Sequence, residues 1–143
     1  LLVAGGAVYY FWPEAVVDLG ILLIQNYEQA MREDTYGGKT PEETLKLFVE
    51  ALKKEDVELA SKYFMLDDNG SREKWEKRLA ELKEKNLLLT MAGDIEKRSR
   101  ADEESRLNEE DFNFIILNDD GTVGAEINMQ LNKYSGIWKI ENL

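Results

Sequence analysis

Apolar residues fill the amino-terminal stretch of the chain without a break. No residue from Leu1 to Trp12 is charged, and the run ends in an aromatic cluster made of Tyr9, Tyr10, Phe11 and Trp12. Aromatic side chains of this kind gather at the headgroup level, where a membrane-spanning helix leaves the lipid. Because a bilayer core requires about 20 residues, we expect residues 1–12 to be the outer part of a transmembrane helix. The alternative is an ordinary helix of a protein core.

A second hydrophobic helix is predicted to begin at Pro13, because proline fits the first position of a helix and Glu14 complements its positive end. We expect this connecting helix over residues 13–34, hydrophobic at first and amphipathic later. Its first half is apolar on nearly every side, which is typical of a buried or lipid-embedded helix. The residues expected to contact the folded domain on one side, and lipid or another subunit on the other, are Val16, Val17, Leu19, Ile21, Leu22, Leu23 and Ile24.

The paired glycines within residues 35–39 predict a short flexible hinge, followed by a domain over residues 40–143. Thr40, Pro41 and Glu43 form a strong helix start, with Thr40 as the N-cap and Glu43 completing a capping box. This helix is expected to run to about Lys54.

Two further helical patterns follow. A short helix restarts at Glu55 and Asp56, and Ser71 is expected to cap a third. Trp75, Leu79 and Leu82 form the inward stripe of that third helix. We expect it to continue to about Arg98, with a kink near Gly93.

The pattern then changes from helical to alternating. Residues 112–117 alternate from Phe112 onwards, residues 118–121 have hairpin-turn chemistry, and residues 125–131 alternate again. After a second turn, residues 137–140 form the last strand. Helices followed by an antiparallel meander predict an α+β fold in which the helices cover one face of the sheet. Polar Glu126, Asn128 and Gln130 indicate that the other face is partly solvated.

Composition restricts the chemistry more than it identifies it. The formal net charge of −11 and the interleaving of basic with acidic residues argue against nucleic acid as a partner. The sequence contains no Cys and no His, so thiolate chemistry, disulfides and His-based relays are excluded. Catalysis would depend on Asp, Glu, Tyr or Lys. We predict no cofactor and no metal.

The globular part resembles a known superfamily. The run Thr40-Pro41-Glu42-Glu43-Thr44-Leu45-Lys46-Leu47-Phe48-Val49-Glu50-Ala51-Leu52-Lys53-Lys54-Glu55-Asp56, with Ala60, Tyr63-Phe64 and the closing Gly136-Ile137-Trp138-Lys139-Ile140, is similar to extracytoplasmic domains of the nuclear transport factor two-like superfamily. These include uncharacterised membrane-anchored or lipoprotein domains of bacteria. The resemblance implies a cone-like fold of helices and a curved antiparallel sheet, with Arg106 and Leu107 as candidates for a fourth strand. This chain has no lipidation Cys, so its anchor would be the apolar segment itself.

Two acidic turns and three isolated side chains are the remaining candidate sites. Residues 67–70 match an EF-hand register only in part, because Met65 stands at its first position, so a polar loop before a helix cap is the preferred interpretation. Residues 118–121 are explained by hairpin chemistry. An enzyme of this fold would use Tyr or a carboxylate inside the cone, for which Tyr63, Asp111 and Glu126 are conceivable, although no motif selects them.

The flank of the apolar segment predicts orientation. Between Trp12 and Gly38 the only basic residue is Arg32, whereas cytoplasmic flanks are normally rich in Lys and Arg. We therefore expect a membrane-anchored, outward-facing envelope protein with a small non-enzymatic binding or assembly domain. The alternatives are a structural subunit packed into a multimer or filament through its amino-terminal helices, and an isomerase-like or hydrolase-like enzyme.

Overall fold

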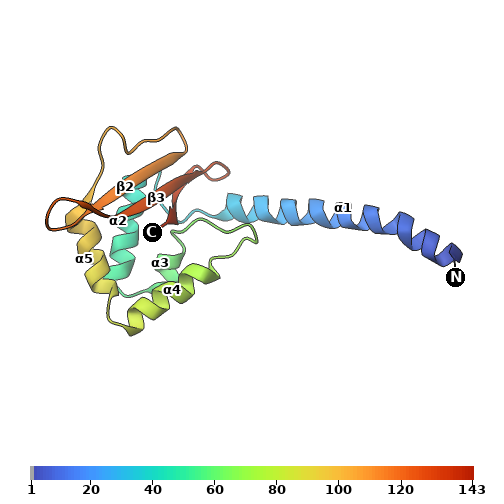
Figure 1. Cartoon of the computed structure of the whole chain (residues 1–143), viewed down its shortest axis with the longest axis horizontal. Helices are drawn as coiled ribbons and strands as arrows, with labels where there is room; N and C mark the ends of the chain where they lie inside the picture. Colours follow the sequence, from blue (N-terminus) through green and yellow to red (C-terminus); the bar gives the residue numbers. More distant parts are fainter. Residues whose placement is uncertain (1) are drawn as a thin grey trace.

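The computed structural model describes the backbone of residues 2–143 and the side chains of residues 18–143. It consists of an α+β domain and a long amino-terminal helix, α1 (Leu2–Glu33). Figure 1 shows α1 extending away from the domain as a single rod, with the amino terminus at its far end.

The predicted boundary at Pro13 is wrong, because α1 is continuous through that position. A proline removes one backbone hydrogen bond and favours a kink, but it does not force a helix to end. The predicted membrane-interface residues Tyr9, Tyr10, Phe11 and Trp12, and the predicted contact residues Val16 and Val17, lie outside the described side chains. Among the residues whose side chains are described, no helix is long and apolar enough to cross a membrane.

The sheet is a four-stranded antiparallel meander in the order β1 (Ser99–Arg100), β2 (Asp111–Leu117), β3 (Val123–Asn132) and β4 (Ile137–Asn142). The three predicted strands are confirmed. The fourth lies at Ser99–Arg100, where it pairs with Ile115 and Ile116 of β2. Arg106 makes only an isolated bridge to Phe112, so the Arg106–Leu107 strand is not formed. Two residues give no readable alternation, which is why the sequence pattern missed β1.

Helix α2 (Pro41–Lys53) begins as predicted. Thr40 Oγ1 accepts a hydrogen bond from the Glu43 amide at 3.2 Å, and Glu43 Oε2 accepts one from the Lys39 amide at 2.8 Å. The reciprocal bond therefore reaches one residue further back than in a standard capping box. Helix α3 (Val57–Ser61) follows directly, with Asp56 capping the Leu59 amide at 3.0 Å.

The long third helix expected from the sequence is two helices, α4 (Glu73–Glu84) and α5 (Leu88–Arg98). The break lies at Asn86, which has a φ of 57°, and not at Gly93. The Leu87 amide donates to the Leu82 carbonyl at 2.9 Å and the Asn86 amide to the Lys83 carbonyl at 3.0 Å, which is a Schellman ending. Asparagine tolerates the left-handed conformation that this ending requires.

The core lies between the helices and one face of the sheet. Of the alternating positions in β2 and β3 and the inward stripe predicted for α4, Phe112, Phe114, Ile127, Met129, Trp75 and Leu79 are buried. Ile116, Leu131 and Leu82 are only partly buried, and Ala125 is exposed. Phe64 links the layers, because its ring meets Phe48 edge-on at 5.4 Å and stacks on Trp75 at 4.2 Å between centroids. The largest fully buried apolar side chains are Phe48, Phe64, Leu52, Leu79, Leu88, Ile95, Ile127, Met129 and Ile140.

The glycine pair expected to form a hinge packs against β4. The Gly38 amide donates to Thr44 Oγ1 and the Gly38 carbonyl accepts from the Trp138 amide, at 2.8 and 2.9 Å. Gly37 has a φ of +139°, and a Cβ there would lie 2.6 Å from both Ile137 Cγ2 and the Trp138 carbonyl oxygen. Glycine is therefore needed here for close approach.

Gly37→Ala is expected to lower the free energy of unfolding by about 2–4 kcal/mol, because overpacking against the backbone of β4 adds to strain at a positive φ. Chemical denaturation followed by circular dichroism measures this loss. Gly93→Ala is the matched control, since a Cβ added at Gly93 would have no neighbouring atom within 4 Å. That control should gain about 0.5–1 kcal/mol from helix propensity. Equal effects of both substitutions would contradict the close-packing role.

Candidate functional site: the α1 junction

An exposed apolar segment on α1 is the feature of the described surface that most requires a partner. The segment, residues 19–24, carries five large aliphatic side chains that are between 49% and 61% exposed: Leu19, Ile21, Leu22, Leu23 and Ile24. At the end of this segment Leu23 and Ile24 line a shallow crevice with Tyr134 and Asp68, yet they are the two most exposed of the five. The contact with the folded domain expected for this segment is therefore at most slight.

The carboxyl-terminal end of α1 is fixed to the sheet. Met31 is buried, and its carbonyl oxygen accepts a hydrogen bond of 2.8 Å from Asn132 Nδ2 at the end of β3. The Arg32 guanidinium lies 5.4 Å from the Tyr134 ring centroid in the next turn. These contacts come from residues about 100 positions away along the chain, so α1 is part of the domain at this end.

Asp34, directly after α1, is the centre of a buried charge cluster that we call the junction cluster: Asp34, Arg72 and Lys139. Lys139 Nζ donates to Asp34 Oδ1 at 3.0 Å, and Arg72 donates to Asp34 Oδ2. The side chains of Lys139 and Asp34 are 0% and 3% exposed. The cluster joins the end of α1 to β4 and to the residue before α4.

The other polar atoms of the cluster are also satisfied. Lys139 Nζ donates to the carbonyl oxygens of Tyr36 and Lys62, which completes the three bonds that an ammonium group can donate. Arg72 Nε donates to the Phe64 carbonyl at 2.7 Å. Burial lowers the pKa of Lys139 from its ordinary 10.5 to about 8, against the opposing attraction of Asp34. The burial cost therefore exceeds the stabilisation that Asp34 gives to the charged form.

Sequence reasoning missed all three residues of this cluster. Alternation along β4 correctly places Lys139 on the opposite side from Trp138 and Ile140, where a lysine would normally be solvated. Lys139 is covered by residues 34–36 and by residue 62, and no local sequence pattern connects these residues to β4. The one sequence signal for the cluster is Asp34, an acid at the carboxyl-terminal end of a helix, where the helix dipole disfavours negative charge.

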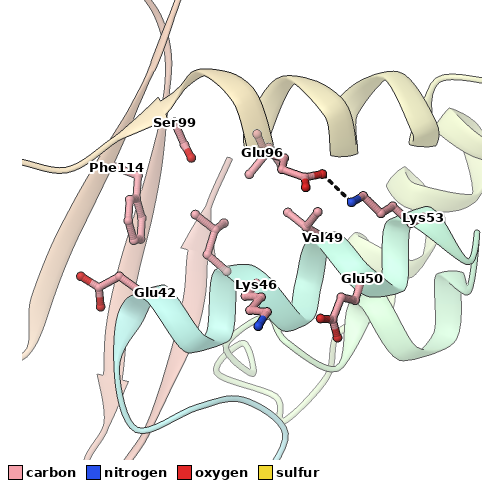
Figure 2. A pocket seen from close by; sticks show the side chains of 10 residues that line it. Glu42, Lys46, Val49, Glu50, Lys53, Glu96, Ser99 and Phe114 are labelled. Carbon is pink, nitrogen blue, oxygen red and sulfur yellow. Dashed lines mark ion pairs between the residues drawn. The ribbon is translucent and has the colours of Figure 1, made fainter.

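A cavity between α2 and α5 encloses about 320 Å³. Its inner wall is apolar, formed by Leu45, Val49, Ile95 and Phe114. Figure 2 shows Val49 pointing from α2 towards α5, with the Lys53–Glu96 ion pair, 2.5 Å long, bridging the two helices. Charged Glu42, Lys46 and Glu50 lie around it with mixed sign. An apolar pocket with this rim can hold a small apolar group, but its residues do not indicate a particular ligand or reaction.

A second apolar cavity of about 380 Å³ lies between α4, α5 and the strands β2 and β3. Met91, Ile116 and Ile127 contribute to its wall, and Asp94 and Glu126 are its acidic members. Asp94 is already partnered by Arg98 at 3.6 Å.

The conceivable catalytic residues are not brought together. Asp111 faces Gln130 and Glu126 faces Ile115 across the β2–β3 ladder, so the two carboxylates are four positions apart, or about 13 Å. Tyr63 lies along the outer edge of β4, where its carbonyl oxygen accepts a hydrogen bond from the Ile140 amide. Burial, and then the charge of Glu50, raise the pKa of Tyr63. Tyr63 and Trp138 are aromatic residues of the hydrophobic core.

Both acidic turns are accounted for by their own hydrogen bonds. Asp67 Oδ1 accepts from the Asn69 and Ser71 amides, each at 2.9 Å, and Asp120 Oδ1 accepts from the Thr122 amide at 2.9 Å. Within the described residues no group of three or more His, Cys, Asp or Glu could hold a metal ion.

Asp34→Ala is expected to destabilise the fold by about 3 kcal/mol at pH 7, because it leaves the Lys139 ammonium buried without a counter-charge. Asp119→Ala is the control, since the 2.9 Å pair of Asp119 with Arg98 involves a carboxylate that is 90% exposed. The control should cost less than about 1 kcal/mol. Denaturant unfolding of the three proteins makes the comparison, and a similar loss for both variants would contradict a structural role of the cluster.

Stability should rise with pH above about 8. Because the pKa of Lys139 is about 8 in the folded protein, the folded state binds fewer protons than the unfolded state between pH 8 and 10.5. The gain from this one group approaches about 3 kcal/mol by the upper end of that window. Lys139→Met removes the titration and keeps the Asp34–Arg72 pair. Unfolding free energies measured across this range should rise for the parent protein relative to Lys139→Met, and parallel profiles would be contrary to it.

No protein-family model, no curated protein and no solved structure matches the chain. The resemblance to the nuclear transport factor two-like superfamily therefore stays a prediction.

Proposed function

We propose that this chain is a membrane-attached, outward-facing envelope protein, in which α1 holds a small binding or assembly domain at the lipid surface. The observation that carries the proposal is the exposed apolar segment, residues 19–24. Its five aliphatic side chains lie beyond the body of the domain, on a helix whose preceding sequence is also apolar.

The arrangement around the helix favours lipid over a single protein partner. Successive residues of an α-helix are 100° apart, so Leu19 and residues 21–24 surround α1 on all sides. A two-helix contact covers only one stripe of a helix, whereas lipid covers its whole circumference. Full burial of a Leu or Ile side chain is worth about 1.5–3 kcal/mol. Covering five half-exposed side chains would therefore contribute several kcal/mol to membrane association.

The acidic flank supports the outward orientation. Arg32 is the only basic residue between Trp12 and Gly38, and its guanidinium packs against Tyr134. This flank of α1 therefore has few of the positive charges that keep a flanking segment on the cytoplasmic side of a membrane. The α+β meander with its helices on one face agrees with the coarse architecture of the nuclear transport factor two-like superfamily. That this chain belongs to the superfamily and has its cone-like shape is part of the proposal.

Absence of cysteine from the sequence allows a direct test. A single Leu22→Cys variant of the full chain, labelled with an environment-sensitive fluorophore, should shift to shorter emission wavelength when lipid vesicles are added. Leu89→Cys is the matched control, because Leu89 is 54% exposed on α5, away from α1. Its emission should not change. If neither label responds, or both respond equally, the membrane proposal fails.

The multimer alternative has its own signature in the same experiment. A shift at position 22 that occurs without lipid and disappears on dilution would replace membrane contact by self-association. Leu22→Asp with Leu23→Asp should weaken vesicle binding by at least about 100-fold, since each charge within the lipid costs about 2.5–3.5 kcal/mol.

A further inference from the structure

A cavity at the α1 junction has a chemistry different from that of the two apolar cavities. It encloses about 300 Å³ between α1, the loop before α4, and the ends of β3 and β4. Its wall combines aromatic rings from Tyr27 and Trp75 with the carboxylates of Asp68 and Glu141 and the amide of Gln130. We call it the junction cavity.

The junction cavity carries an excess of negative charge. Three carboxylates, those of Asp67, Asp68 and Glu141, line it with one ammonium group, that of Lys74. Asp67 is engaged by the Asn69 and Ser71 amides. Asp68 and Glu141 are exposed residues at the rim of the cavity, and within the described part of the chain they make no ion pair and accept no side-chain hydrogen bond. Burial, and then the charge of Asp68, raise the pKa of Tyr27, so the negative potential extends to the phenol.

Trp75 shows which kind of group this wall attracts. One face of its ring stacks on Phe64, and the Lys74 ammonium lies 4.8 Å from its centroid. The Arg78 guanidinium lies 5.8 Å away. Cations gather on aromatic rings because the ring face is negative. Of these two cations, Lys74 also lines the junction cavity, so the protein's own chain already places one positive group at this wall.

Other ligand classes fit less well. An anion would be repelled by the carboxylates, and a wholly apolar ligand would leave their charge without a partner. A metal ion needs several converging oxygen ligands, and the described residues supply no such group. An organic cation fits best, because its carbon atoms can pack on the aromatic and apolar walls while its charge is neutralised by the two unpaired carboxylates.

We propose that the junction cavity binds an organic ammonium ion, whose charge is neutralised by Asp68 and Glu141 and whose carbon atoms pack on Tyr27. The ligand is either a soluble amine or the choline or ethanolamine headgroup of a lipid. The lipid source rests on the proposed function, and it is geometrically direct, because Tyr27 and Asp68 also line the crevice formed by Leu23 and Ile24 of the exposed apolar segment.

The first experiment uses soluble choline and the full chain in an uncharged detergent, with ligand binding followed by nuclear magnetic resonance at constant ionic strength. Saturable binding with a dissociation constant of about 1 mM is expected. Asp68→Asn with Glu141→Gln should weaken binding by about 10-fold or more. The control, Glu81→Gln with Glu84→Gln, makes the same charge change on the exposed face of α4 and should leave binding unchanged.

Two results would overturn the proposal: no saturable binding of choline beyond the sodium-matched baseline, or equal weakening by both double variants, which would indicate only a general acidic surface. Thermal unfolding verifies that the variants are folded.

The second experiment separates the two sources. If a lipid headgroup is the ligand, the parent chain should prefer phosphatidylcholine vesicles to phosphatidylglycerol vesicles by more than its net charge of −11 alone explains. Asp68→Asn with Glu141→Gln should reduce that preference further than Glu81→Gln with Glu84→Gln, which makes the same charge change. Leu22→Asp with Leu23→Asp should weaken binding to both vesicles and keep the affinity for soluble choline. Choline binding without vesicle binding would retain the cavity and reject the membrane proposal. Vesicle binding without choline binding would support the membrane proposal and reject the ammonium site in the junction cavity.

Discussion

The junction cluster is the interaction on which the arrangement of this molecule depends. A single carboxylate, that of Asp34, is shared by Lys139 of β4 and by Arg72 at the start of α4, so three segments distant in the sequence meet at one point. Removing these charges from water is costly, so the intact cluster adds little net stability, whereas loss of one partner leaves a buried charge unpaired. Because Asp34 directly follows α1, the cluster sets where the helix leaves the domain.

Sequence patterns predicted those elements of the fold whose formation depends on neighbouring residues. The start of α2 follows from Thr40 and Glu43, and the alternation from Phe112 onwards gives β2 with its inward face. The division between α4 and α5 was missed although it has a local signal, because Asn86 follows Lys83 and Lys85 and asparagine after basic residues is a known helix ending. The two-residue β1 is formed by its partner β2, and no pattern in Ser99–Arg100 could show it.

The site was predicted in part, for a similar reason. Exposed aliphatic residues on α1 were predicted from excess hydrophobicity, because apolar surface is visible in the sequence wherever it occurs. Lys139, Arg72 and the junction cavity depend on which segments meet in space. Gly37 is the same kind of case: a glycine pair indicates either flexibility or close packing, and only the neighbouring Ile137 decides between them.

The sheet has little room for another strand. Along the outer side of β4, the Trp138 and Ile140 amides donate to Gly38 and Tyr63, and the Ile140 carbonyl accepts from Met65. Along the outer side of β2, residues 115 and 116 pair with β1, and the Asn113 amide donates to Ser105. Exposed strand edges are the usual templates for unplanned pairing between chains. With β4 covered and the opposite edge reduced to the two residues of β1, crowding many copies of this domain on one surface offers little strand edge for pairing between copies.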